Sequence, residues 1–305
     1  MRAVYPAFTL AMVVASGLCL RHALGDREAR ATRSGSQRAG GEASASRHAS
    51  REDLALYAAA LVYGLLLEKA TVIAFDAYSY PASEYLVAPL GIPVAIALGW
   101  SAVIYAGVAT ARGLGVPRVS LPGFVALYAL HVDLSMDAVA IRVPYWVWHD
   151  PGPWFGVPLG NFFGWFCVAA LLPAWFLGLR RRVRNVWLRG GLAVGLSVAS
   201  LVPLLEAWTT LTWETPLAKV AVLVGGGVLA LALLVRHRPA FHGRPAPHAL
   251  AATLVFHVFF LGLLVVEGYY RPRPWLLAVA VGMLATGLAV HWLPAAPKRT
   301  RDPGR

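Results

Sequence analysis

Apolar segments of about 20 residues recur along the whole chain, and each is long enough to cross a bilayer as an α-helix. The nine segments lie at residues 3–20, 54–74, 86–108, 120–141, 157–179, 187–207, 217–235, 248–269 and 275–294. Because backbone polar groups inside a bilayer must be hydrogen-bonded within the protein, long apolar segments of this kind cross it as helices. The pattern therefore predicts an all-α fold, a polytopic membrane helix bundle of about nine transmembrane helices.

The composition agrees with a membrane location. Apolar residues make up 58% of the 305 residues and charged residues only 14%, whereas soluble domains carry about 25% charged residues. The net charge is +12, but the basic residues fall in short clusters between apolar segments. Such clusters are typical of loops that orient a membrane protein, so we expect no nucleic-acid partner. The two cysteines, Cys19 and Cys167, lie inside apolar segments and predict neither a disulfide framework nor a thiolate metal site.

The distribution of basic residues predicts the topology. With nine spans, roughly 21 of the 27 Lys and Arg residues fall on one face, as the positive-inside rule requires of the cytoplasmic side. These residues lie in the segments 21–53, 112–118, 180–189, 236–244 and 298–305. We therefore expect a multi-pass protein of the plasma membrane whose C-terminus is cytoplasmic.

The same pattern divides the chain into four parts. Residues 1–20 are expected to form an N-terminal transmembrane anchor; a cleaved signal peptide is the alternative, but cleavage would leave the basic linker outside. Residues 21–53, rich in Ser, Gly, Ala and Arg, are predicted to form a disordered basic cytoplasmic linker. Residues 54–296 are predicted to form an eight-helix membrane catalytic domain, and residues 297–305 a disordered basic tail.

Two decapeptides in the chain are closely similar. Residues 91–100 read GIPVAIALGW and residues 156–165 read GVPLGNFFGW, and each begins an apolar segment. Each follows an acid and an aromatic pair: Glu68, Tyr78 and Tyr80 before the first, and Asp137, Trp146 and Trp148 before the second. The repeat predicts duplicated helical hairpins. The acids Glu206 and Glu267, each followed by aromatic residues, extend the same plan to the last two hairpins. There, similarity without duplication remains the alternative, because hairpins have similar lengths and aromatic rings gather at bilayer interfaces in any case.

Acids inside the apolar segments are the candidate catalytic residues. Asp133 and Asp137 lie four residues apart and share a helix face. Each costs about 2.5–3.5 kcal/mol near the centre of a membrane helix, which favours a functional role over simple hydrogen bonding between helices. Glu68 is expected to face the bundle while its neighbour Lys69 reaches the interface. Asn161 and Trp165 also lie four residues apart, so they point in the same direction.

Several familiar reaction centres are absent from the sequence. It contains no phosphate-binding Gly-rich loop and no His-Glu-x-x-His zinc helix. It also has no Gly-x-Ser-x-Gly nucleophile motif and no Cys-x-x-Cys pair. The pair of Asp133 and Asp137 alone is too small an acidic set for the magnesium diphosphate site of a prenyltransferase. We therefore expect neither a metal nor a cofactor.

The acids and decapeptides resemble the membrane carotenoid hydratase family, carotenoid biosynthesis proteins that include bisanhydrobacterioruberin hydratase and carotenoid 1′,2′-hydratase. The resemblance covers about a third of the chain. It rests on Glu68, YSY (78–80) and the first decapeptide, and on DLSMDAVA (133–140), WVW (146–148) and GPWFGVPLGNFFGW (152–165). It implies an enzyme that adds water to the terminal double bond of an acyclic carotenoid. The implied partners are that carotenoid, membrane lipid and other enzymes of the carotenoid pathway.

The residues suit this reaction for independent reasons. A carboxyl group surrounded by hydrocarbon resists ionisation and can donate a proton, and aromatic faces stabilise the resulting tertiary cation. We expect Asp137 or Asp133 to donate the proton and Glu68 to orient or deprotonate water. The substrate-binding residues are expected to be Tyr78, Tyr80, Trp146, Trp148, Asn161 and Trp165. The alternatives are a cyclase of the same end group, which starts with the same protonation, and a non-enzymatic carotenoid or lipid transporter or scaffold.

Overall fold

The computed structural model describes residues 3–31, 39–212, 215–237 and 245–292. Within these ranges it contains nine helices that are long and apolar enough to cross a membrane, which confirms the all-α polytopic bundle. They are α1 (Val4–Ala31), α2 (Ala39–Phe75), α3 (Val94–Gly113), α4 (Leu121–Ala140), α5 (Leu159–Gly178), α6 (Val186–Thr212), α7 (Pro216–His237), α8 (Pro247–Val266) and α9 (Pro274–Trp292). The short elements are β1 (Tyr78–Ser79), β2 (Val147–Trp148), η2 (Ala82–Glu84), η3 (Pro89–Gly91) and η4 (Leu179–Arg181).

The first two helices extend further than the apolar segments predict. Helix α1 continues to Ala31 and α2 begins at Ala39, so both reach into the segment expected to be a linker. Ala, Arg and Glu, which occur there, are good helix formers even where the segment is polar. Residues 32–38 of the predicted linker and the predicted tail at 297–305 lie outside the described residues.

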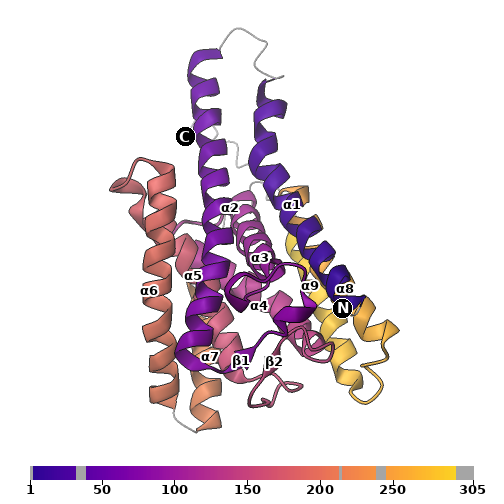
Figure 1. The fold of residues 1–305 in the computed structure, drawn as a ribbon. Coiled ribbons are helices and arrows are strands. Elements are labelled where there is room, and N and C mark those ends of the chain that lie inside the picture. Colours follow the sequence, from indigo (N-terminus) through magenta and orange to yellow (C-terminus); the bar gives the residue numbers. More distant parts are fainter. Residues whose placement is uncertain (1–2, 32–38, 213–214, 238–244, 293–305) are drawn as a thin grey trace, which may run out of the picture.

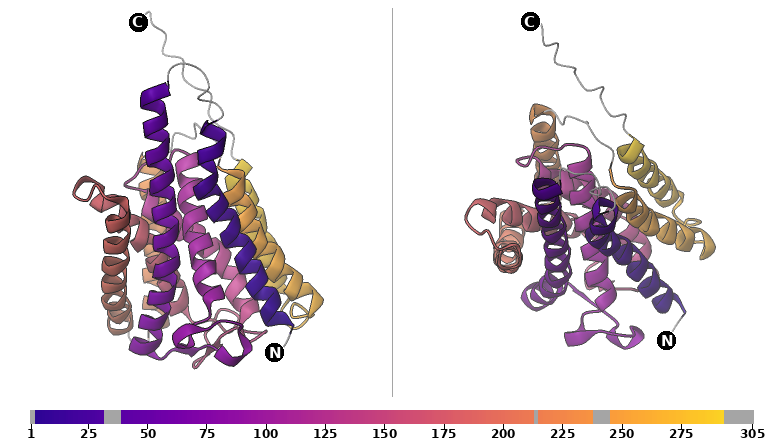
Figure 2. Two further views of the ribbon diagram at one scale, coloured as in Figure 1. Left: turned by 45° about the horizontal axis from the view of Figure 1, so that its top comes forward. Right: turned by 90° about the horizontal axis from the view of Figure 1, so that it is seen from above.

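Helix α4 occupies the middle of the bundle, where it packs against α3, α5, α7, α8 and α9. Helices α6 and α7 lie at one side, and α8 and α9 lie at the other (Figures 1 and 2). The strands β1 and β2 lie together at one end of the bundle, in the loops that join α2 to α3 and α4 to α5. This arrangement brings the two predicted hairpins together at the end that carries the aromatic pairs.

The two decapeptides adopt the same backbone conformation. In each, the glycine and the residue before it have positive φ, a conformation that glycine adopts readily. The φ angles are 55° at Leu90, 82° at Gly91, 51° at Phe155 and 96° at Gly156. The proline two residues after each glycine is the N-cap of a 20-residue helix, α3 or α5. The repeated sequence therefore acts as a turn that starts the second helix of each hairpin.

Helix α1 is joined to the bundle by polar contacts as well as apolar ones. The Ser16 hydroxyl lies 2.6 Å from the Tyr57 hydroxyl and 2.8 Å from that of Ser101, which connects α1 to α2 and α3. The Tyr5 hydroxyl donates to the Pro144 carbonyl at 2.9 Å. Because buried hydroxyls stabilise a fold only when they are paired, these bonds fix the position of α1 against the other helices.

A buried arginine connects α6 to α2 at the end opposite the strands. The Arg189 side chain is 2% exposed and donates to Glu52 at 2.7 Å, and its guanidinium lies 4.6 Å from the centre of the Phe176 ring. Arg189→Ala is expected to destabilise the protein by on the order of 2–4 kcal/mol, because it leaves a partly buried carboxylate without its nearest partner. The midpoint of thermal unfolding in detergent would fall. The exposed Arg182→Ala is the control, and equal midpoints for the two variants would contradict this role.

Candidate active site

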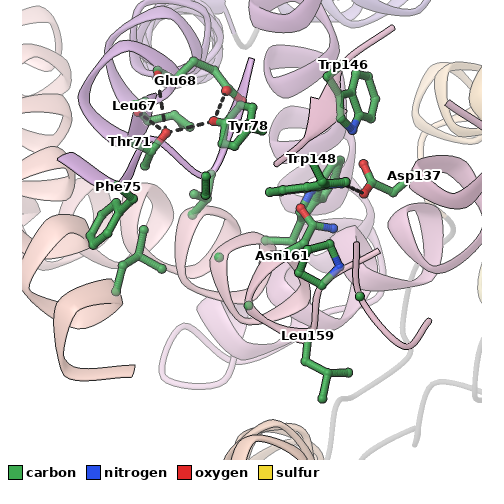
Figure 3. Close-up of a pocket in the computed structure, with 18 of the residues that line it drawn as sticks. Leu67, Glu68, Thr71, Phe75, Tyr78, Asp137, Trp146, Trp148, Leu159 and Asn161 are labelled. Carbon is green, nitrogen blue, oxygen red and sulfur yellow. Dashed lines mark hydrogen bonds between the residues drawn. The ribbon is translucent and has the colours of Figure 1, made fainter. Parts of the chain in front are cut away.

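A cavity of about 670 Å³ lies beneath the paired strands, within the size range of small-molecule sites. Eight of the nine residues that the sequence predicts for the site line it: Glu68, Tyr78, Tyr80, Asp137, Trp146, Trp148, Asn161 and Trp165. Figure 3 shows several of them converging from α2, α4, α5 and the two strands. Residues from α2 to α5, which are distant in the sequence, thus form one site.

Glu68 has the most hydrogen-bond donors of the three acids. The Tyr78 and Tyr80 hydroxyls donate to its Oε2 at 2.5 and 2.8 Å, and the Trp100 indole donates to its Oε1 at 2.6 Å. The side chain is 5% exposed. Its neighbour Lys69 turns away and donates to the Leu90 carbonyl at 3.1 Å, as expected from the sequence. Both oxygens of Glu68 are therefore held as acceptors at the cavity wall.

The two tyrosines keep their protons. Their withdrawal from water raises the pKa of Tyr78 and Tyr80 well above its usual range, and the nearby charge of Glu68 raises it further. Deprotonation would place a second negative charge beside the carboxylate, so both phenols remain donors. The Tyr78 hydroxyl also lies 2.9 Å from the Thr71 hydroxyl (Figure 3). The tyrosines thus orient Glu68 without competing for a proton in the neutral range.

Asp137 lies on the other side of the cavity. Its side chain is 2% exposed, and its Oδ2 accepts from the Trp148 indole at 3.3 Å (Figure 3). This bond is longer than any of the three that hold Glu68. Asp137 therefore faces the cavity with weaker hydrogen bonding than Glu68, although both acids line the same space.

Asp133 is the predicted site residue that does not line the cavity. It is completely buried, and its Oδ2 accepts from the side-chain amide of Asn161 at 2.9 Å. Among the described residues, its Oδ1 has no hydrogen-bond partner. Asn161 does line the cavity. Asp133 thus lies behind Asn161, whereas Asp137, on the same helix face, lines the cavity.

The site has an approximate two-fold axis. Strand β1 pairs with β2 in antiparallel register, with Ser79 opposite Val147 and Tyr78 opposite Trp148. Ser79 and Val147 are the middle residues of YSY (78–80) and WVW (146–148) and so hold equivalent places in the two hairpins. A local two-fold axis of the paired strands therefore passes between Ser79 and Val147. The Trp100 and Trp165 rings, which close the two decapeptides, meet at 4.2 Å between ring centres. The two hairpins thus contact each other through equivalent residues both in the strands and at the ends of the decapeptides.

Trp100 is a site residue that sequence reasoning did not assign. Its indole contacts both halves of the site, through the bond to Glu68 and the contact with Trp165. Gly64 makes this approach possible, since a Cβ there would lie 3.0 Å from the Cβ of Trp100 and from the Cα of Ala97. The sequence feature that indicates Trp100 is the Gly-Trp that ends each decapeptide, because Trp165, a predicted site residue, holds the same position in the second copy.

Other lining residues come from helices without a motif. Phe8 and Met12 of α1 and Phe256 of α8 line the cavity, and all three are almost fully buried. Trp208 of α6 also lines it and stacks on Phe163 with 4.6 Å between ring centres. The acids of the last two hairpins are not among the lining residues. These walls are therefore mainly apolar and aromatic, and the lining acids that are buried are Glu68 and Asp137.

Comparison with known proteins gives one family. A family model described as carotenoid biosynthesis protein matches residues 42–226. No curated protein and no solved structure matches the chain. The matched range includes both hairpins with their acids and aromatic pairs, and it extends into α7.

Proposed function

The chain belongs to the family of carotenoid biosynthesis proteins, and we propose that within this pathway it adds water to the terminal double bond of an acyclic carotenoid. Membership of the family assigns the protein a role in carotenoid biosynthesis. The nine apolar helices also make it a multi-pass membrane protein, in keeping with a substrate dissolved in the bilayer. The hydration reaction is the step that the site geometry supports best.

One observation carries the proposal. Two buried carboxyl-bearing side chains, Glu68 and Asp137, line a single cavity whose other walls are mainly apolar and aromatic, whereas the third lining acid, Asp150, is exposed. Hydration of an isolated alkene needs a proton donor on one side and a group that accepts a proton from water on the other. A pair of acids with different hydrogen-bond partners can divide these two tasks.

The proposed reaction begins with proton transfer from the Asp137 carboxyl group to the less substituted carbon of the double bond. The π electrons form the new C–H bond and leave a tertiary cation. A water oxygen then bonds to that carbon, and Glu68 takes the proton that the water loses. Return of this proton to Asp137 completes the cycle, with one water added and no change in oxidation level. Glu68 suits the acceptor role because three donors already orient its oxygens.

The aromatic residues support the cationic intermediate. The Tyr78 ring lies 5.0 Å from that of Trp148, and the Tyr80 ring 6.5 Å from that of Trp146, so two pairs of rings flank the axis. A cation over such faces is stabilised by about 2 kcal/mol when the site is dry. Asn161, which lines the cavity and is fixed by Asp133, is positioned to hold the attacking water.

The proposed orientation places the site at the outer face of the plasma membrane. Arg112, Arg180 and Arg189 lie at the opposite end of the bundle from β1 and β2, where Asp53 pairs with Arg112 at 2.5 Å and Glu52 with Arg180 at 3.3 Å. The positive-inside rule assigns that end to the cytoplasm. The C-terminus would then also be cytoplasmic. Water could reach the site from the outer face, while the substrate stays in the bilayer.

Expression in a lycopene-producing host tests the function. The expected result is a pigment whose mass is greater than that of lycopene by one water, or by two if both ends react. Cyclisation of the same end group would leave the mass unchanged, and a transporter or scaffold would leave the pigment itself unchanged. Unaltered lycopene in membranes that contain the inserted protein would count against the hydratase.

A further inference from the structure

The cavity extends past the acids to a closed, apolar inner end. Its walls there come from Phe8 and Met12 of α1, Gly99 of α3 and Phe256 of α8. Met12 is 1% exposed and Phe256 is 3% exposed, so no substrate chain can continue through this wall. Helices α1 and α8 lie outside the family-matched range of 42–226. Three of these four wall residues therefore come from parts of this chain that the family match does not cover, and only Gly99 lies within it.

The inner end is closely packed around Gly99. A Cβ at Gly99 would lie 3.2 Å from the Met12 sulfur and 3.9 Å from the Phe256 ring, so the absence of a side chain at Gly99 lets Met12 and Phe256 pack close to α3. Gly99 directly precedes Trp100, whose indole donates to Glu68. Met136, which directly precedes Asp137, lines the cavity as well. The inner end and both acids therefore belong to the same cavity.

In the other direction the cavity opens between helices. The lining there consists of Phe75, Leu205, Thr209, Pro216 and Lys219, at the ends of α2 and α6 and the start of α7. Thr209 and Pro216 are exposed, and the other three are partly exposed. Figure 3 shows Phe75 on the far side of the cavity from Asp137. Because α6 and α7 lie at the outside of the bundle (Figures 1 and 2), this opening is on a side that we expect to face lipid.

We propose that the substrate lies with its branched terminal group against Met12, Gly99 and Phe256, while its polyene leaves the cavity past Leu205 toward the lipid. This inference rests on the proposed function and deepens it. The closed end then selects the size of the terminal group, and the open side accepts any long, linear polyene.

The experiment compares two substrates in one reaction: lycopene and an analogue whose terminal methyl groups are replaced by ethyl groups. Wild-type protein is expected to hydrate lycopene faster. Met12→Ala enlarges the inner end and should move the rate ratio toward the analogue by on the order of tenfold, because each methylene in an apolar pocket is worth about 10-fold or more in discrimination. Leu205→Ala, on the open side, should slow both substrates alike. The control Val13→Ala lies on the same helix as Met12 but is 48% exposed, and should leave the ratio unchanged.

The ratio is measured within one sample, so partial misfolding of a variant does not alter it. An unchanged ratio in Met12→Ala, or a shift caused by Leu205→Ala instead, would overturn the proposed orientation. The amounts of the two carotenoids that co-purify with each variant provide a readout that needs no turnover. If the wild type hydrated neither substrate, the hydratase would be refuted, whereas a shift in the co-purified ratio would still support the orientation.

Discussion

Asp137→Asn is expected to abolish hydration while the protein still inserts into the membrane. The amide can keep a hydrogen bond to Trp148 but cannot deliver a proton to the alkene. General acids contribute about 10²–10⁴-fold to rate, so the pigment assay should show at least a 100-fold loss. Protein amount in the membrane fraction is measured alongside the pigments.

Asp133→Asn is the matched comparison, since it makes the same chemical change four residues away. Its side chain does not line the cavity, and an amide oxygen at this position can still accept from Asn161. This variant should therefore retain much more activity than Asp137→Asn. The opposite order, with Asp137→Asn active and Asp133→Asn inactive, would transfer the role of proton donor to Asp133.

Glu68→Gln is expected to reduce hydration by about 100-fold or more, because it removes the group that takes the proton from water. Glutamine has one acceptor oxygen in place of two, so at least one of the donors that surround Glu68 would face an amide N–H. The same assay measures this loss. Glu206→Gln is the control, because Glu206 is exposed and does not line the cavity.

The donors around Glu68 provide a graded test. Trp100→Phe keeps an aromatic ring beside Trp165 but loses the N–H that reaches Oε1, and Tyr80→Phe loses one donor to Oε2. Each should cost less than Glu68→Gln, because the remaining donors still orient the carboxylate. Full activity in Glu68→Gln would remove Glu68 from the reaction, whatever the outcome for its donors.

The helices and the acids could be predicted because their signals are local. A span needs about 20 apolar residues, and an acid within one stands out from its neighbours. The decapeptides also predicted that two hairpins are alike. They did not show that Ser79 and Val147 lie opposite each other. A strand of two residues is too short to show the alternation of polar and apolar side chains by which strands are predicted. Nor did the decapeptides show that Trp100 contacts Trp165.

The inner wall of the cavity could not be predicted from the sequence for a different reason. Met12 lines the cavity and Val13 is exposed, yet both are apolar residues in one apolar segment. In a membrane protein the lipid-facing and core-facing sides of a helix are both apolar. Hydropathy alone therefore cannot distinguish a residue that binds substrate from one that touches lipid, and only the packing of α1 against the bundle does so.

The two-fold axis between the hairpins has a consequence for the stereochemistry of the product. In the proposed hydration, a planar double bond bound between the two acids would turn one face toward Asp137 and the other toward Glu68. A proton from the first side and water from the second then add to opposite faces. The paired strands and the Trp100–Trp165 contact thus imply anti addition, which hydration in deuterium oxide would record in an end group with one isotopically labelled methyl.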